Sequence, residues 1–174
     1  MNKAKKYFVV ALTGTPGAGK TSAAKLLNKK RFAVIELNSE IKKRKLYGGY
    51  DRKRKTYVAD FGKIGKFLKK ELCAEKYRGK KIIIDSHLSH LLPSRIVDAV
   101  IVLRCESAAL EKRLAKKGWS AEKIRENAEA EIIGLIEYEA RKKRGKVFAI
   151  DATRLTAEQI ARKIARLLAG VINF

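Results

Sequence analysis

The chain has 174 residues, of which 46% are hydrophobic and 34% are charged. This composition fits one domain with a single core and excludes a disordered tail. Its 41 Lys and Arg outnumber its 18 Asp and Glu, which gives a formal net charge of +23. Such an excess of positive charge predicts attraction to polyanions such as RNA or nucleotide phosphates.

The sequence lacks the features of membrane proteins and of secreted proteins. No apolar run approaches the roughly 18 residues that a membrane helix needs, and the N-terminal run Tyr7–Leu12 is too short for a signal peptide. The two cysteines, Cys73 and Cys105, cannot form a disulfide framework and lack the spacing of metal ligands. We therefore expect a cytoplasmic protein that makes no membrane contact.

Short apolar runs alternate along the chain with segments whose apolar residues recur at helical spacing. The runs predict five strands, at Tyr7–Leu12, Phe32–Leu37, Lys81–Asp85, Ala99–Leu103 and Val147–Ile150. Helices are predicted at Gly19–Lys30, from Asn38 or Ser39 into a basic cluster, across 60–77, from near Ser107, from near Ser120 to before Gly145, and from a capping box at Thr156. This order predicts an α/β fold with a mostly parallel sheet, in one domain over residues 1–174.

The basic cluster consists of two runs, Lys42–Lys45 and Arg52–Lys55, on either side of Tyr47–Asp51. One interpretation is a solvated basic helix and loop that serves solubility. The other is a surface that holds the phosphates of a nucleotide or of RNA. Composition leaves both interpretations open.

The segment Gly14–Thr21 matches the phosphate-loop pattern G-x-x-x-x-G-K-[ST], between a predicted strand and a predicted helix. Gly14, Gly17 and Gly19 allow successive backbone N–H groups of the loop, which includes Ala18, to surround an anion. The following helix adds its positive dipole end. Lys20 can reach the β- and γ-phosphates, and the Thr21 hydroxyl can ligate Mg²⁺. These residues predict that the chain binds a nucleoside triphosphate.

Three further residues are candidates for the reaction. Asp85 ends a predicted strand and is placed to anchor Mg²⁺ or its water, although it could instead cap a turn. His87 could orient or deprotonate an attacking water or hydroxyl, or it could be a hydrogen-bonded structural histidine. We expect His90 to be structural or exposed. Arg95 follows a rigid turn that could aim its guanidinium at a second phosphate, or it is a surface arginine.

Together, the segments Gly14–Thr21, Leu46–Asp51 and Asp85–His87 resemble the adenylate kinase isoenzyme 6 family. The segments Pro93–Arg95 and Leu110–Trp119 extend this resemblance over nearly the whole chain. The family includes archaeal adenylate kinases and eukaryotic nuclear ATPases of small ribosomal subunit maturation. The resemblance implies a P-loop NTPase fold of the nucleoside monophosphate kinase type, with a five-stranded parallel sheet flanked by helices.

The same resemblance implies Mg²⁺-dependent phosphoryl transfer from ATP to AMP, together with ATP hydrolysis. It also implies a small-subunit ribosomal protein and rRNA as partners. We expect the chain on its own to be a monomer. The alternative is a ribosome-assembly factor that is switched by ATP and whose kinase activity is incidental.

Site residues follow by position from the resemblance. Gly17, Gly19, Lys20, Thr21 and Ser22 would hold ATP, with Asp85 and His87 as the Asp-x-His pair. A lid would span about Lys116–Glu126 and include Lys117. A monophosphate segment would span about Asn38–Phe61, and the candidates for contacting the acceptor are Asn38, Arg44, Tyr50 and Arg95. Lys117 and Ser86 depart from the family, which commonly has Arg and Tyr there.

Overall fold

The computed structural model describes residues 7–28, 32–52, 56–143 and 145–171. Its centre is a sheet in which β1 (Phe8–Gly14) lies between β5 (Lys81–Asp85) and β6 (Ala99–Arg104). The outer strands are β2 (Phe32–Glu36) beside β5 and β7 (Val147–Asp151) beside β6. All four pairings are parallel, which confirms the predicted five-stranded parallel sheet.

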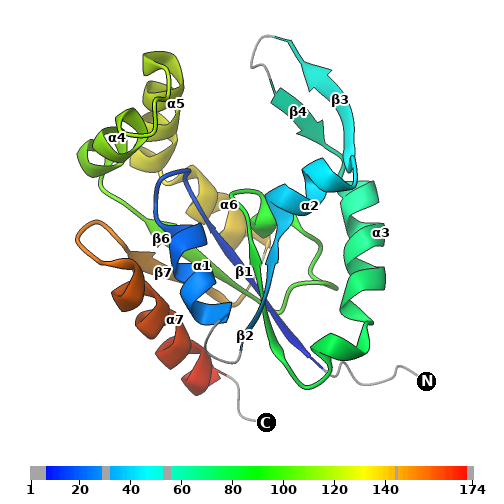
Figure 1. The fold of residues 1–174 in the computed structure, drawn as a ribbon. Helices are drawn as coiled ribbons and strands as arrows, with labels where there is room; N and C mark the ends of the chain where they lie inside the picture. The colour runs from blue at the N-terminus through cyan, green and yellow to red at the C-terminus, as the bar shows by residue number, and fades with distance from the viewer. Residues whose placement is uncertain (1–6, 29–31, 53–55, 144, 172–174) are drawn as a thin grey trace.

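Helices cover both faces of this sheet (Figure 1). Because successive side chains of a strand point to opposite faces, Val9 and Ala11 of β1 enter one apolar cluster, and Val10 and Leu12 enter the other. The first cluster packs against α2 (Leu37–Lys43), α3 (Phe61–Leu72) and α6 (Leu135–Lys143). The second packs against α1 (Lys20–Asn28), α4 (Ser107–Ala115) and α7 (Ala157–Val171). Burial on both faces explains why the strands are almost uniformly apolar.

Two predicted helix starts are confirmed by their capping bonds. At α7, the Thr156 amide donates to Gln159 Oε1 (2.8 Å) and the Gln159 amide donates to Thr156 Oγ1 (3.3 Å), which is a reciprocal capping box. At α5 (Ala121–Ile132), the Ser120 hydroxyl accepts a hydrogen bond from the Lys123 amide. Both side chains satisfy backbone N–H groups that have no partner within the helix.

The prediction of one helix from Ser120 to before Gly145 is wrong. The structure has two helices there, α5 and α6, which are separated at Gly134. The φ angle of Gly134 is 65°, a left-handed conformation that ends a right-handed helix. Apolar periodicity does not detect such a break, because it continues into the next helix.

The segment after α2 is not a helix and loop, which was one of the two interpretations of the basic cluster. It forms an antiparallel hairpin of β3 (Tyr47–Asp51) and β4 (Thr56–Ala59), a second sheet separate from the first. The hairpin stands away from the central sheet, across from α4 and α5 (Figure 1). The connection over residues 53–55 lies outside the described residues. These three residues are members of the basic cluster.

Strand register positions the site. Leu12 of β1 pairs with Asp85 of β5, so the end of β5 lies beside the turn that follows β1. The carboxyl ends of parallel strands are where ligands bind in such sheets. None of the helices in the described part of the chain is both long enough and apolar enough to cross a membrane.

Candidate functional site

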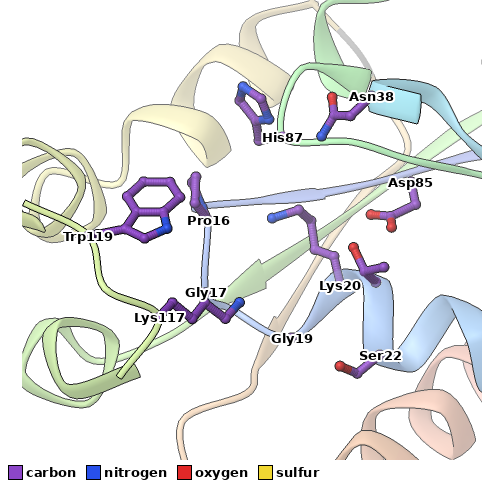
Figure 2. A pocket seen from close by; sticks show the side chains of 11 residues that line it. Pro16, Gly17, Gly19, Lys20, Ser22, Asn38, Asp85, His87, Lys117 and Trp119 are labelled. Atoms are coloured by element: carbon purple, nitrogen blue, oxygen red, sulfur yellow. The ribbon is translucent and has the colours of Figure 1, made fainter. Parts of the chain in front are cut away.

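A pocket of about 290 Å³ opens at the carboxyl ends of β1 and β5. Figure 2 shows His87 and Asn38 on one side of the phosphate loop and Trp119 and Lys117 on another. The lining residues come from the phosphate loop, from α1, from the start of α2, from the end of β5 and the residues after it, and from the α4–α5 connection: Pro16, Gly17, Gly19, Lys20, Thr21, Ser22, Asn38, Asp85, His87, Lys117 and Trp119.

The phosphate loop needs glycine at its first position. Gly14 has a φ angle of 134°, and a Cβ there would lie 2.3 Å from the Leu103 carbonyl oxygen of β6. Gly17 and Gly19 also have positive φ angles, and both line the pocket. Gly14 itself is not among the lining residues; its carbonyl oxygen accepts a hydrogen bond from Lys20.

The expectation for Ala18 is not met. Ala18 is fully buried and does not line the pocket. Its amide donates to the Thr15 carbonyl oxygen at 3.1 Å, within the loop. This N–H group is therefore already bonded, and the amides around Gly17 and Gly19 are better placed to meet an anion.

Lys20 lies on the floor of the pocket with only 8% of its surface exposed. Its ammonium group donates to the carbonyl oxygens of Gly14 (2.6 Å) and Thr15 (3.0 Å). Burial lowers the pKa of Lys20 to about 8, while the nearby Asp85 carboxylate acts in the opposite direction. An anion bound in the pocket would favour the charged form, so Lys20 is suited to pair with phosphate.

Asp85 and Thr21 meet beside Lys20. The Thr21 hydroxyl bonds to the Asp85 carboxylate, and burial raises the pKa of Asp85 against the influence of Thr21 and Lys20. Within the described residues, Asp85 Oδ1 is a buried oxygen with no hydrogen-bond partner. A buried acceptor without a partner is costly unless a ligand satisfies it.

These oxygens fit Mg²⁺. The described residues contain no group of three or more His, Cys, Asp and Glu that could hold a metal on its own. Mg²⁺ in nucleotide sites needs no such group, because one or two protein oxygens, waters and phosphate oxygens complete its shell. Thr21 and Asp85 would supply the protein oxygens.

The other wall carries His87 and Asn38. Burial, with a contribution from Lys20, lowers the pKa of His87 to about 4, so its imidazole is neutral near pH 7. Asn38 Oδ1 accepts a hydrogen bond from the buried Ser86 hydroxyl at 2.8 Å, which fixes the amide of Asn38. A neutral imidazole and a fixed amide can hydrogen-bond an incoming phosphate or hydroxyl.

Three predicted residues do not reach this pocket. Arg44 is exposed, bonds to Glu40 at 2.5 Å and lies over the Phe67 ring, so it is held on the α2–α3 surface. Tyr50 lies on the hairpin with 52% of its surface exposed.

Arg95 is exposed and precedes Asp98, whose amide donates to the Val9 carbonyl oxygen at the other end of β1. The rigid turn therefore leads into the amino end of β6, away from the phosphate loop.

A buried network behind the phosphate loop was not predicted. Glu131 near the end of α5 is 4% exposed and accepts hydrogen bonds from the Thr15 hydroxyl, from Arg104 Nε (2.7 Å) and from the Cys105 amide (3.0 Å). Arg104 also donates to Glu137 of α6 at 2.9 Å. The sequence gives no signal for Glu131, which stands among other charged residues of a helix.

His90 is structural, as one of the two alternatives predicted. It is buried, with Nδ1 3.0 Å from Thr13 Oγ1 and Nε2 2.9 Å from Glu139 of α6. Trp119 and Pro16 line the pocket without having been singled out. Trp119 stands two residues after Lys117 in the α4–α5 connection. Its position next to a predicted lid residue could have indicated that it lines the pocket.

Comparison with solved structures supports the fold. A deoxyadenosine kinase from M. mycoides, solved with dCMP and dCDP bound, matches with a TM-score of 0.57 at 19% identity. The match covers 94% of this chain and 100% of that one. The chain therefore shares the fold of this kinase.

Comparison of sequences identifies relatives. A Methanosarcina acetivorans protein named "Putative adenylate kinase" is 44% identical over 170 residues, covering 95% of this chain and 89% of that protein. A Methanosarcina mazei protein of the same name is 43% identical over 183 residues, covering 95% and 91%. Residues 10–134 also match the AAA domain family. The chain therefore belongs to the AAA domain family and to the family of these archaeal proteins.

Proposed function

We propose that this protein is a Mg²⁺-dependent adenylate kinase that transfers the γ-phosphoryl group of ATP to AMP and forms two ADP. One observation carries the proposal: Lys20, Thr21 and the unpartnered Asp85 oxygen converge in one pocket with the phosphate loop. Phosphoryl transfer depends on positioning and charge neutralisation, which these groups supply. The names of the archaeal relatives favour the same activity.

Each side of the pocket has a role in this proposal. Gly17, Gly19, Lys20 and Ser22 bind the ATP phosphates, and Thr21 with Asp85 holds Mg²⁺, which neutralises phosphate charge when bound. His87 and Asn38 orient the AMP phosphate from the opposite wall, and the segment of about Asn38–Phe61 holds the acceptor. Lys117 and Trp119 belong to a lid over about Lys116–Glu126 that closes over ATP.

We also propose that the enzyme hydrolyses ATP. The lid consists of the short connection between α4 and α5 and the first turns of α5. A lid this short shields the transferred phosphoryl group from water only in part. Incomplete exclusion of water lets water act as the acceptor when AMP is absent.

The test measures ADP formation from Mg²⁺ and ATP, with and without AMP, in the wild type and in two lysine variants. We expect AMP to accelerate ADP formation, and Lys20→Ala to abolish ADP formation under both conditions. Lys25→Ala changes an exposed lysine of the same helix and should behave like the wild type. Turnover that is independent of AMP would eliminate the kinase, and full activity of Lys20→Ala would eliminate the site.

A second function, in maturation of the small ribosomal subunit, is favoured by the formal net charge of +23. We propose that ATP binding and hydrolysis switch the affinity of this protein for a small-subunit ribosomal protein and rRNA. Binding to rRNA should weaken steeply as salt increases, because each phosphate contact releases counterions. Absence of rRNA binding at physiological salt, with ATP or without it, would contradict this second function.

A further inference from the structure

Three tyrosine rings lie together on one face of the β3–β4 hairpin. The rings of Tyr47 and Tyr57 are stacked with their centroids 4.1 Å apart. Tyr50 meets Tyr57 edge to face at 5.1 Å. The rings therefore form one continuous aromatic surface, which we call the tyrosine face.

A β-bulge creates this alignment. Tyr50 pairs directly with Tyr57, so these two share a face, whereas Tyr47 stands three residues before Tyr50 and would point to the other face of a regular strand. The register shifts between Tyr47 and Gly49, which inserts one extra residue in β3. Because of this extra residue, Tyr47 lies on the same face of the hairpin as Tyr57.

The tyrosine face is open to solvent at its outer end. Tyr50 and Tyr57 are each 52% exposed, and Tyr47 is half-buried against the apolar cluster beneath it. Neither Tyr50 nor Tyr57 lines the pocket described above. Two large exposed rings on a hairpin that stands off the core indicate a surface that receives a ligand (Figure 1).

Basic residues stand before and after β3 in the sequence. Lys42, Lys43 and Lys45 at the end of α2 and Arg52 after β3 are all exposed. Over residues 42–52 the only acidic residue is Asp51. A ligand that covers the tyrosine face and also contacts these cations is expected to carry several negative charges.

We propose that the tyrosine face binds an unpaired RNA strand, with bases stacked on Tyr50 and Tyr57 and phosphates contacted by the flanking lysines. Stacking on aromatic side chains combined with a basic surface is how proteins hold single strands of any sequence. This inference deepens the proposed role with rRNA by naming the surface and the state of the strand. It does not depend on the kinase activity.

The rings favour a single strand over other partners. In an RNA duplex the bases stack on one another, and a protein reaches mainly the backbone and 2′-hydroxyl groups. An acidic protein partner would use the lysines but would have no need of two exposed tyrosine side chains. The aromatic contribution therefore separates the three cases.

The experiment measures binding of the full-length protein to a fluorescein-labelled 12-nucleotide oligouridylate by anisotropy, at several salt concentrations. We expect Tyr57→Ala to weaken binding about five-fold or more, the loss of one stacked base. Tyr57→Phe keeps the ring and should bind like the wild type. Tyr138→Ala is the matched control, because Tyr138 is 63% exposed on α6, and it should also bind like the wild type.

A charge pair of variants tests the phosphate contacts. Lys42→Ala/Lys43→Ala should make the salt dependence of binding shallower, whereas Lys142→Ala/Lys143→Ala at exposed positions of α6 should leave it unchanged. Calorimetry with Mg²⁺ and ATP on Tyr57→Ala checks that the fold and the nucleotide pocket survive the substitution.

Two outcomes would overturn the inference. One is equal oligouridylate affinity for Tyr57→Ala and Tyr138→Ala; the other is equal or tighter binding of a 12-base-pair RNA duplex or of polyglutamate by the wild type. Loss of ATP turnover in Lys20→Ala with unchanged RNA binding would leave the tyrosine face supported. Absence of ATP turnover in the wild type would contradict the kinase and not this surface.

Discussion

Lys20 and Glu131 illustrate how single side chains shape the phosphate loop from opposite sides. Lys20 donates to two loop carbonyl oxygens from the pocket, whereas Glu131 accepts from the Thr15 hydroxyl beneath the loop. Because Glu131 also accepts from Arg104 and the Cys105 amide, one buried carboxylate connects the loop to α5 and β6. We expect this connection to set the shape of the loop before nucleotide arrives.

Glu131→Gln keeps the size of the side chain but removes its charge. Hydrogen bonds to a charged group contribute about 1.5–3 kcal/mol, so the free energy of unfolding should fall by about 2 kcal/mol and ATP should bind more weakly. Urea denaturation and calorimetry measure both. Glu129→Gln, an exposed position two residues earlier, should change the free energy of unfolding by less than about 0.5 kcal/mol. Equal effects of the two substitutions would show that the buried network has no special role.

His87 gives a pH dependence with a definite sign. Its pKa is about 4 in the folded protein, lowered mainly by burial from an ordinary value of 6.5, so between these values the unfolded chain binds more protons. Its contribution to stability is complete above pH 6.5 and is lost as the pH falls toward 4.

From pH 7 to pH 4.5 we expect this effect to lower the free energy of unfolding by about 2 kcal/mol. His87→Gln should show a smaller loss over the same interval, as measured by urea denaturation at both pH values. A wild type and a variant with parallel pH profiles would mean that His87 titrates normally.

At the scale of elements, the junction between α5 and α6 depends on one backbone conformation. Gly134 has a φ angle of 65°, and a Cβ there would lie 3.2 Å from Arg104 Nη1. Gly134→Ala should therefore lower the free energy of unfolding by at least about 1 kcal/mol.

Gly65 provides the opposite case. It lies within α3, and a Cβ there would meet nothing within 4 Å, so Gly65→Ala should raise the free energy of unfolding by about 0.5–1 kcal/mol. Thermal unfolding of both variants measures these shifts. The same sign for both substitutions would contradict the conformations described here.

The elements also show where sequence reasoning succeeds and fails. The parallel strands were predictable because burial on both faces leaves continuous apolar runs such as Ile82–Ile84. The β3–β4 hairpin was not, because Gly48 and Gly49 interrupt β3 and its exposed strands follow no apolar pattern. The apolar periodicity of a sequence therefore does not reveal a hairpin that is bulged and exposed.

For the whole molecule, the phosphate loop and Asp85 were predictable because the pattern is local and parallel topology brings strand ends together. Arg95 is the surface arginine of the two alternatives, because the turn that follows β5 leads to the far end of β6. Glu131 could not be found from the sequence, because its importance arises from contacts with distant residues. Thr15 stands 116 positions before it and Arg104 stands 27 positions before it.

Charge is distributed over the molecule in two ways. The pocket places Lys20 and Lys117 beside Asp85, whereas residues 42–52 hold five basic residues and one acidic residue, Asp51. A single chain can thus hold a nucleotide in a pocket of mixed charge and a larger polyanion on a mainly positive segment. The two sites predict different salt dependences, steep for RNA and shallow for ATP.

Calorimetric titration of the full-length protein with ATP in the presence of Mg²⁺ tests the central claim most directly. The pocket predicts one ATP per chain for the wild type and no measurable heat of binding for Lys20→Ala. If the wild type takes up no ATP, or if Lys20→Ala binds it equally well, the phosphate loop is not a nucleotide site.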